Sequence, residues 1–357
     1  MDGSRPARAR AFGLACGDLP TGPCDAITDV PGVAVGHRTL VAGDVRTGFT
    51  AIRPHDGDLF AEKLPAAVEV INGFGKSLGL MQVAELGQLE TPILLTNTFA
   101  VGCGFDALVG RALAAHPDIG RDTGTVNPVV FECNDGWLSD IRARALGVAD
   151  AEAALDAAAG GPVAEGAVGA GTGMSAFGFK GGIGTASRRF DLDGTGLTLG
   201  ALVLANFGRA GDLVLPDGRR PRPPRAPRRP AAVVDADPPE RGSVIVVLAT
   251  DVPMDGRQLR RVAQRAGVGL ARLGAHWGNG SGDVALAVST AERIPHRAPT
   301  AIATRRVLDE ARIDLLFRAA ADATQEAVLN ALLAAPATGG RDGHFRPSLA
   351  DVLKDKS

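Results

Sequence analysis

Hydrophobic residues in the last third of the chain follow two different periods. Residues 243–249 form a β-branched run without a polar face, which is typical of a strand covered on both sides. Residues 255–273 place apolar side chains at helical spacing with arginines on the opposite face. A second strand is predicted at 283–289, and one or two helices are predicted between Thr300 and about Leu333.

The first two-thirds of the chain contain short apolar segments, each closed by glycine, proline or a polar residue. These segments predict strands at 32–36, 66–71, 93–97, 128–132 and 197–206, and helices are predicted at 76–89 and 139–155. No repeat with a period of 20–50 residues is present. Strands and helices interleaved in one chain predict an α/β or layered α+β architecture.

Composition and charge narrow the choice of partner. The chain has 357 residues, of which 45% are hydrophobic, so it is long enough to bury a large core. Its formal charge of −2 means that the chain has no excess of positive charge to attract nucleic acid or an anionic membrane. No apolar run approaches the length of a membrane span. We therefore expect a small substrate, with no nucleic acid and no membrane as partner.

Neither a metal nor another cofactor is expected. The four cysteines show no metal-ligand spacing, the six histidines are scattered, and tyrosine is absent, which removes phenol chemistry. So few cysteines in so long a chain are typical of reduced thiols, and we expect a cytoplasmic protein.

A proline-rich and arginine-rich segment interrupts the pattern. The run at Arg219–Pro230 holds six arginines and five prolines, a composition that excludes helix and central strand. We interpret residues 217–241 as an exposed connector within a single catalytic domain that spans 1–357.

One serine-hydrolase hypothesis places the nucleophile at Ser77. Residues Gly75–Gly79 match G-x-S-x-G, follow a predicted strand and open a predicted helix, as in the nucleophile elbow of an α/β-hydrolase. Such an enzyme needs a downstream acid and histidine, and no downstream histidine stands out. The same stretch resembles a phosphate loop, but Val70 occupies the position of its first glycine.

A second hypothesis places the nucleophile at Ser243. The pair Gly242-Ser243 lies between the exposed connector and a buried strand. Cleavage between them would leave a serine with a free α-amino group, whose ordinary pKa of about 7.7–8.0 suits a general base at neutral pH. No histidine would then be needed.

Several longer motifs, in order along the chain, favour the second hypothesis. They are Ile27–His37, Leu89–Thr98, Asn134–Leu138, Gly169–Met174, Lys180–Thr185 and Gly242–Asp251. Over almost its whole length the chain resembles the P1 family of self-processing aminopeptidases, which includes the L-aminopeptidase/D-esterase and the β-peptidyl aminopeptidases.

The resemblance implies a fold and a maturation step. The implied fold is a four-layer αββα sandwich, similar to the N-terminal-nucleophile hydrolases but differently connected. Self-cleavage between Gly242 and Ser243 would give chains 1–242 and 243–357, with Ser243 as the N-terminal nucleophile. Assembly as a homo-oligomer, a tetramer of cleaved protomers, is also implied.

The resemblance also implies roles for other residues. Asn206 matches the asparagine whose amide donates to the oxyanion, and Ser281 with Asp283 match the pair that assists the nucleophile. Glu132 matches the acidic residue that holds the substrate's ammonium group. Asn134 stands where well-known members have a tyrosine as a second oxyanion donor, so its shorter side chain predicts an altered rate or preference.

The sequence therefore predicts an autoproteolytic serine aminopeptidase that acts on short peptides, amides or esters through an acyl-enzyme. Two alternatives remain open at this point. One is an α/β-hydrolase-type esterase that uses Ser77, and the other is a non-catalytic protein of the same fold that binds an acidic partner through its arginine-rich connector.

Overall fold

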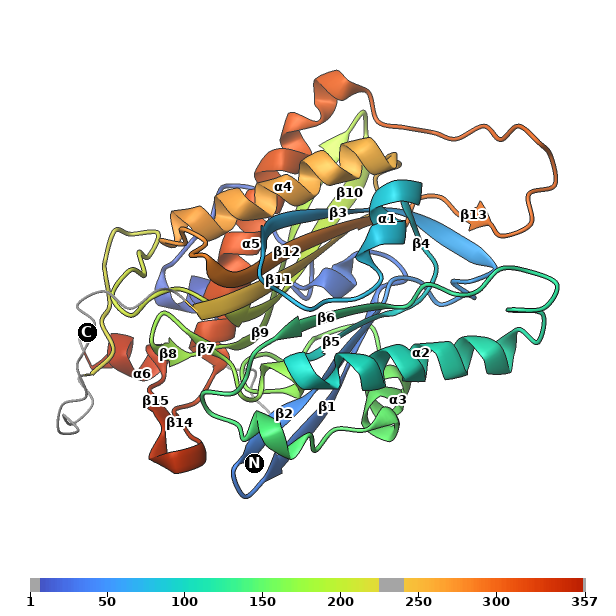
Figure 1. The fold of residues 1–357 in the computed structure, drawn as a ribbon. Helices are drawn as coiled ribbons and strands as arrows, with labels where there is room; N and C mark the ends of the chain where they lie inside the picture. Colours follow the sequence, from blue (N-terminus) through green and yellow to red (C-terminus); the bar gives the residue numbers. More distant parts are fainter. Residues whose placement is uncertain (1–6, 225–240, 356–357) are drawn as a thin grey trace.

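Most strands of the protein form two β-sheets that pack face to face, with helices over the outer face of each sheet (Figure 1). The computed structural model describes residues 7–224 and 241–355. The order of layers is helix, sheet, sheet, helix, so the αββα fold implied by the resemblance is confirmed.

The smaller sheet has four strands. In spatial order they are β1 (Ala34–Ala42), β2 (Val45–Arg53), β5 (Ile93–Asn97) and β6 (Val129–Cys133). Its outer face is covered by α2 (Val101–Ala115) and α3 (Val148–Asp156). β5 and β6 are parallel, so the carboxyl ends of both strands lie at the same edge of this sheet.

The larger sheet has seven strands. In spatial order they are β13 (Ile294–Pro295), β3 (Glu62–Gly73), β12 (Gly280–Ser289), β11 (Arg241–Thr250), β10 (Thr195–Asn206) and β9 (Gly182–Leu192), and β4 (Gln88–Leu89) pairs with β3. Two long helices, α4 (Gly256–Arg272) and α5 (Asp314–Ala334), cover its outer face.

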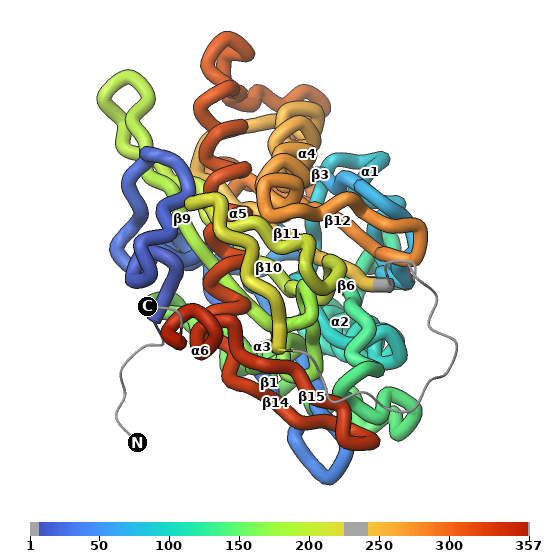
Figure 2. Tube along the Cα trace, turned by 90° about the vertical axis from the view of Figure 1, so that its left-hand side faces the viewer, coloured from blue at the N-terminus to red at the C-terminus, as the bar shows by residue number. Residues whose placement is uncertain are grey.

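Shorter elements complete the fold. They are α1 (Leu80–Leu86), α6 (Leu349–Lys354), the strand pairs β7 (Ser175–Ala176) with β8 (Phe179–Lys180) and β14 (Thr338–Gly339) with β15 (Phe345–Arg346), and 3₁₀ helices at Ala9–Phe12, Ile27–Asp29, Thr98–Ala100, Ile141–Ala143, Gly169–Gly171, Glu310–Arg312 and Arg341–Gly343. Figure 2 shows β14, β15 and α6, in red, in the lower half of the molecule on the side that faces the viewer.

Successive side chains of the central strands contribute to two different apolar layers, one on each face of the larger sheet. On β11, Ile245 and Val247 contribute to the layer between the sheets, whereas Val244 and Val246 contribute to the layer under α4 and α5. Successive side chains of a strand point to opposite faces, so this apolar run is buried on both sides. The alternation also decides which face the residue at the start of the strand presents.

Most predicted strands and the C-terminal helices are confirmed. The predicted helix at 76–89 is limited to α1, and the one at 139–155 is divided into the 3₁₀ helix Ile141–Ala143 and α3. Strands β2 and β9 and helix α2 were not predicted. Of the predicted connector, residues 217–224 contain no helix or strand, and residues 225–240 lie outside the described residues.

One segment of the described chain, Thr98–Ala115, is long and apolar enough by composition alone to span a membrane. It contains α2, whose buried residues Val101, Gly104, Ala107 and Leu108 pack in the layer against β5 and β6. The helix therefore serves as the outer layer of this fold.

A buried ionic cluster fastens the N-terminal segment to the larger sheet. Arg188 of β9 and Glu326 of α5 have fully buried side chains and form an ion pair with 2.6 Å between Nη2 and Oε2. Glu326 also binds Arg10, and Arg188 donates to the carbonyl of Cys16 at 2.6 Å. Burial of two charges is tolerated because each is paired and hydrogen-bonded.

Glu326→Ala is therefore expected to lower the free energy of unfolding by about 3–5 kcal/mol, because it removes the carboxylate that pairs with the buried Arg188 guanidinium at 2.6 Å and leaves it only the more distant Asp25 at 3.9 Å. Urea unfolding followed by circular dichroism measures this change. Glu310→Ala is the control, because Glu310 pairs with Arg257 and Arg261 at the surface and should leave the midpoint almost unchanged. Equal losses in the two variants would contradict the account.

Candidate active site

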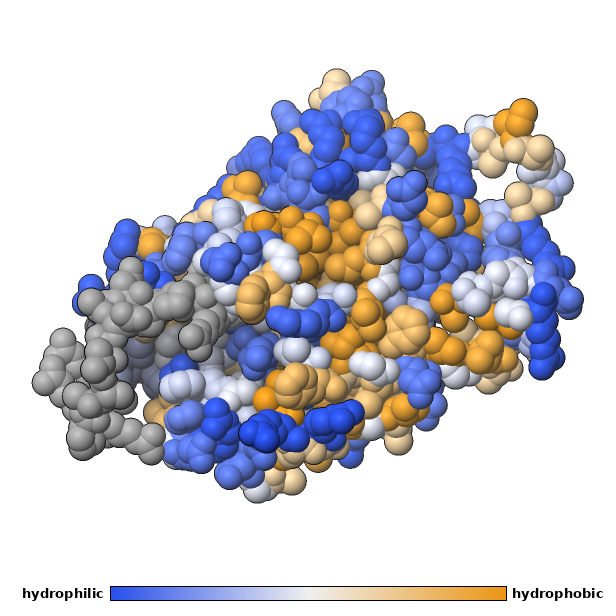
Figure 3. Space-filling model, in the orientation of Figure 1, coloured by the Kyte–Doolittle hydropathy of each residue, from blue (hydrophilic) through white to orange (hydrophobic). Residues whose placement is uncertain are grey.

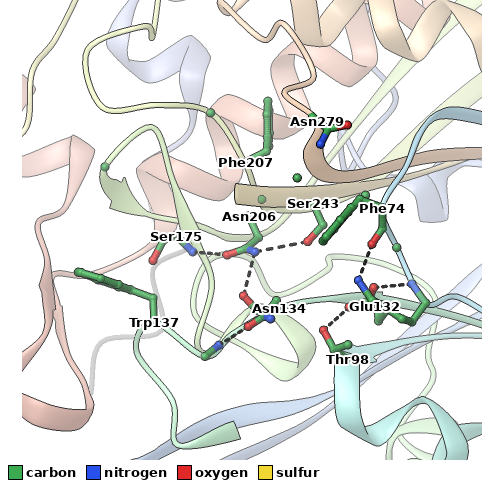
Figure 4. A pocket seen from close by; sticks show the side chains of 18 of the residues that line it. Phe74, Thr98, Glu132, Asn134, Trp137, Ser175, Asn206, Phe207, Ser243 and Asn279 are labelled. Atoms are coloured by element: carbon green, nitrogen blue, oxygen red, sulfur yellow. Dashed lines mark hydrogen bonds between the residues drawn. The ribbon is translucent and has the colours of Figure 1, made fainter. Parts of the chain in front are cut away.

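A cavity of about 670 Å³ opens where the ends of β6, β10, β11 and β12 meet (Figure 4). Its wall is completed by the Phe74–Lys76 loop after β3, by the loop after β6 and by Arg346. Four residues singled out from the sequence line this cavity, namely Glu132, Asn134, Asn206 and Ser243, together with Gly242. Ser281 and Asp283 do not line it.

Ser243 and Asn206 form a cross-strand pair at the open ends of β10 and β11. They are register partners, and alternation places both side chains on the face toward the other sheet, in phase with Leu204 and Ile245. Asn206 Nδ2 lies 3.4 Å from Ser243 Oγ (Figure 4). The serine hydroxyl is thus placed next to an amide donor, and both side chains are buried.

The Asn206 amide is held by two further hydrogen bonds. Its Oδ1 accepts from the backbone N–H of Ser175 at 3.0 Å, and its Nδ2 donates to the backbone carbonyl of Asn134 at 2.9 Å. The first bond fixes which end of the amide is oxygen, so the N–H group faces Ser243. A donor fixed in this way before reaction can stabilise an oxyanion without reorganising.

Position 242 has no room for a side chain, so glycine is required there. A Cβ atom there would lie 2.8 Å from the carbonyl oxygen of Asn206 and 2.9 Å from Cα of Phe207. These are backbone atoms of the paired strand, so a side chain would push β11 away from β10. Gly242 is within a regular strand, so its conformational freedom is not what the site needs.

Ser281 and Asp283 are brought together as predicted. Ser281 Oγ donates to Asp283 Oδ1 at 2.7 Å, and both residues are fully buried. In the parallel pairing of β11 with β12, they lie beside Gly242 and Val244. They are in phase with Ala285, which faces the helices, so the pair adjoins the backbone of the Gly242–Ser243 peptide from the face opposite to the serine hydroxyl.

Glu132, the residue before the last one of β6, is buried and lines the cavity. Its Oε1 accepts from the backbone N–H of Lys76 at 2.8 Å, and its Oε2 accepts from the hydroxyl of Thr98. Among the described residues, no cationic side chain pairs with it; Lys76 instead directs its ammonium to the carbonyl and ring of Phe74. A buried, oriented carboxylate without a counter-ion is suited to bind a cationic group.

Asn134 contributes to the site mainly through its backbone. Its side-chain oxygen accepts from the N–H of Gly136 at 2.8 Å in a local turn, while its carbonyl receives the Asn206 amide. The side chain is exposed, and the part expected for it as a second oxyanion donor stays a prediction.

Two buried ionisable groups, Asp135 and Lys180, lie near the loop that carries Asn134. Burial raises the pKa of Asp135 to about 7, and the neighbouring Thr47 and Asn97 oppose the rise. Burial also lowers the pKa of Lys180 to about 7, against the charge of Asp135. Lys180 Nζ donates to the carbonyls of Gly171 and Gly181 at 2.9 and 2.7 Å.

Sequence reasoning missed several residues around Ser243. Cys133 faces the layer between the sheets, where burial raises the pKa of its thiol well above the usual range and a hydrogen bond with Ser243 opposes that rise. Thr98, Trp137, Ser175 and Arg346 also line the cavity. The alternation that places Ser243 is visible in the sequence, but the approach of these loops is tertiary.

Ser77 does not serve as a nucleophile elbow. It is partly buried, does not line the cavity, and makes no hydrogen bond with any histidine of the described chain. Its neighbour Lys76 holds Glu132, and Leu78 bridges to Val130 of β6. Within the described residues, no three histidine, cysteine or acidic side chains converge as metal ligands.

The chain is similar to known proteins in both sequence and fold. The chain is 39% identical over 354 residues to the β-peptidyl aminopeptidase BapA of Sphingosinicella microcystinivorans. The matched region covers 94% of this chain and 88% of the relative. Among solved structures, the PH0078 protein of Pyrococcus horikoshii OT3 is 44% identical with a TM-score of 0.88, and 98% of each chain is covered.

A third similar protein of the same fold is described as a serine aminopeptidase. The L-aminopeptidase D-Ala-esterase/amidase of Ochrobactrum anthropi is 36% identical with a TM-score of 0.85, again over 98% of each chain. It is described as a prototype for the serine aminopeptidases and as a variant of the N-terminal-nucleophile hydrolase fold. The model of peptidase family S58 matches residues 25–346, and on these grounds the chain belongs to peptidase family S58.

Proposed function

We propose that this chain is a serine aminopeptidase of the N-terminal-nucleophile type that generates its own nucleophile by cleavage before Ser243. The observation that carries the proposal is the placement of Ser243, which follows a sterically required glycine and faces the fixed amide of Asn206. Membership of peptidase family S58 supports the same class of reaction.

Maturation uses the serine hydroxyl on its own peptide bond. Ser243 Oγ attacks the carbonyl carbon of Gly242, the C–N bond breaks, and the hydroxyl proton goes to the nitrogen, which gives an ester and a free amine. Water then hydrolyses the ester, releasing the Gly242 carboxylate and restoring the hydroxyl. Asn206 stands next to Oγ and donates to the oxyanion that forms in each step.

Turnover repeats this chemistry on a substrate. The freed amine accepts the proton of Ser243 Oγ, the oxygen attacks the substrate carbonyl, and the leaving amine takes the proton as the acyl-enzyme forms. Water releases the acyl group. The hydrogen-bonded pair Ser281–Asp283 adjoins the peptide bond whose cleavage produces this amine, and the Asp283 carboxylate favours its protonated form during transfer.

Glu132 restricts the enzyme to substrates with a free N-terminus. Its carboxylate lies on one side of Ser243, and Trp137 lies on the other (Figure 4). An ammonium group bound to Glu132 places the first carbonyl of the substrate near Ser243 and Asn206, so a single residue is removed. From the names of the relatives we take only the shared class, release of N-terminal residues from short peptides, amides or esters.

We also propose a homo-oligomer. An apolar patch covers β3, α1 and α4 on the face seen in Figure 3, with Val70, Met81, Leu86 and Val268 exposed. Beyond Ala66, β3 pairs only with β12 in the described chain, so its outer edge is open. Exposed apolar area beside an open strand edge is typical of subunit interfaces.

Ser243→Ala is expected to remain a single chain of 357 residues, whereas the wild type separates into fragments of 242 and 115 residues. The variant lacks the attacking oxygen, so hydrolysis of aminoacyl p-nitroanilides is lost as well. Intact-mass spectrometry and an absorbance assay make the two measurements.

Ser77→Ala is the matched serine control and should retain both cleavage and turnover. Loss of turnover in Ser77→Ala with retention in Ser243→Ala would restore the elbow hypothesis. A wild type that stays whole and inert would instead favour the binding-protein alternative.

Glu132→Gln is expected to raise KM and lower kcat/KM for a free-amine substrate by about 10- to 100-fold, because the amide keeps the shape but loses the charge that attracts the ammonium group. Steady-state kinetics with an aminoacyl p-nitroanilide measures the loss, and Glu85→Gln, an exposed carboxylate of α1, is the control. Equal kinetics in Glu132→Gln and the wild type would show that Glu132 does not bind the ammonium group.

A further inference from the structure

Arg346 forms part of the cavity wall from the end of β15. Its guanidinium lies 4.5 Å above the Trp137 ring, which stacks on His344 with 4.0 Å between ring centres and 7° between planes. His344 Nδ1 is also 2.7 Å from the carbonyl of Trp137. Packing between the C-terminal hairpin and the loop after β6 therefore fixes the position of this cation.

The Arg346 guanidinium has no anionic partner among the described residues. Within the described part of the chain, its hydrogen bond to an oxygen is a long one, from Nη1 to the carbonyl of Phe345 at 3.4 Å. Its Nε is buried without an acceptor, and burial alone lowers its pKa to about 10. A desolvated guanidinium with unused donors is costly unless something occupies them, and it is suited to a planar anion.

The place of this cation relative to the nucleophile indicates which part of a substrate it meets. Trp137, on which Arg346 lies, and Glu132 are on opposite sides of Ser243 and Asn206 (Figure 4). A substrate with its ammonium at Glu132 and its first carbonyl at Ser243 extends its leaving group toward Trp137. Along the cavity the substrate would meet the carboxylate of Glu132, the hydroxyl of Ser243 and the guanidinium of Arg346. These three groups are complementary to the ammonium group, the first carbonyl and the C-terminal carboxylate of a short peptide.

We propose that Arg346 binds the C-terminal carboxylate of the substrate, so that the preferred substrates are dipeptides and tripeptides with a free C-terminus rather than amides or esters. The inference rests on the proposed aminopeptidase function and adds the class of leaving group. A guanidinium donates two parallel hydrogen bonds to a carboxylate, which a neutral amide cannot accept in the same way. A cavity of about 670 Å³ is within the range for such small ligands.

The test compares one dipeptide and one tripeptide with their C-terminal amides, using the cleaved full-length enzyme. The wild type is expected to have the higher kcat/KM for the free acids. Arg346→Ala should reduce the acid-to-amide ratio of kcat/KM by about 10- to 100-fold, and Arg346→Lys should restore part of the ratio because it keeps the charge without the planar fork.

Arg142→Ala is the charge control. Arg142 is exposed on the neighbouring 3₁₀ helix and does not line the cavity, so its removal should leave the ratio unchanged. Intact mass and thermal unfolding are recorded for each variant, so that a misfolded protein is recognised. If Arg346→Ala misfolds, the acid-to-amide ratio of Arg346→Lys tests the proposal instead, since lysine fills nearly the same space as arginine.

An unchanged acid-to-amide ratio in Arg346→Ala and Arg346→Lys would overturn the proposal, as would a wild type that prefers the amides. If the proposed aminopeptidase function itself is wrong, the result differs, because the wild type then hydrolyses neither the acids nor the amides. A fall in thermal stability with no change in the ratio would assign Arg346 to the structure of the hairpin alone.

Discussion

The close pairing of β10 with β11 at their open ends is the constraint on which the site depends. Gly242 lets the two backbones approach, and the register then sets Ser243 opposite Asn206 on the face between the sheets. A side chain at position 242 would separate the strands and remove the amide from the hydroxyl. The proposed nucleophile, the amide proposed as its oxyanion donor and the Gly242–Ser243 bond are therefore all placed by a single strand pairing.

The stacked sheets supply the groups that surround this pair. β6 of the smaller sheet brings Glu132 and Cys133 up to the end of β11, and the loop that follows β6 carries both the carbonyl that holds Asn206 and the ring beneath Arg346. β12 sets Ser281 and Asp283 beside the Gly242–Ser243 peptide from the other face. The serine hydroxyl thus faces the cavity, while the hydrogen-bonded pair Ser281–Asp283 adjoins the backbone nitrogen, and this separation suits the proposed nucleophile, which would supply its own base.

Sequence periodicity predicts the strands of the central sheet because they are apolar on both faces, and the layered order follows from the resemblance to the P1 family. β9 is not predicted because Arg188 interrupts its apolar pattern, and the partners that make this buried charge tolerable, Glu326 at 2.6 Å and Asp25 at 3.9 Å, are far away in the chain. α2 escapes because three glycines in its first ten residues resemble a loop. Glu132 is found from its motif, whereas Arg346 is not, since its place in the cavity depends on how the hairpin of β14 and β15 packs.

The central claim is that Ser243, as the first residue of a cleaved chain, carries the acyl group. The most direct measurement is to quench turnover of an aminoacyl ester with acid, digest the protein and locate the added mass. The account predicts an acyl group on a peptide that begins at Ser243, and none when Asn206→Ala slows acylation. An adduct on Ser77, or on a peptide that still contains the Gly242–Ser243 bond, would contradict it.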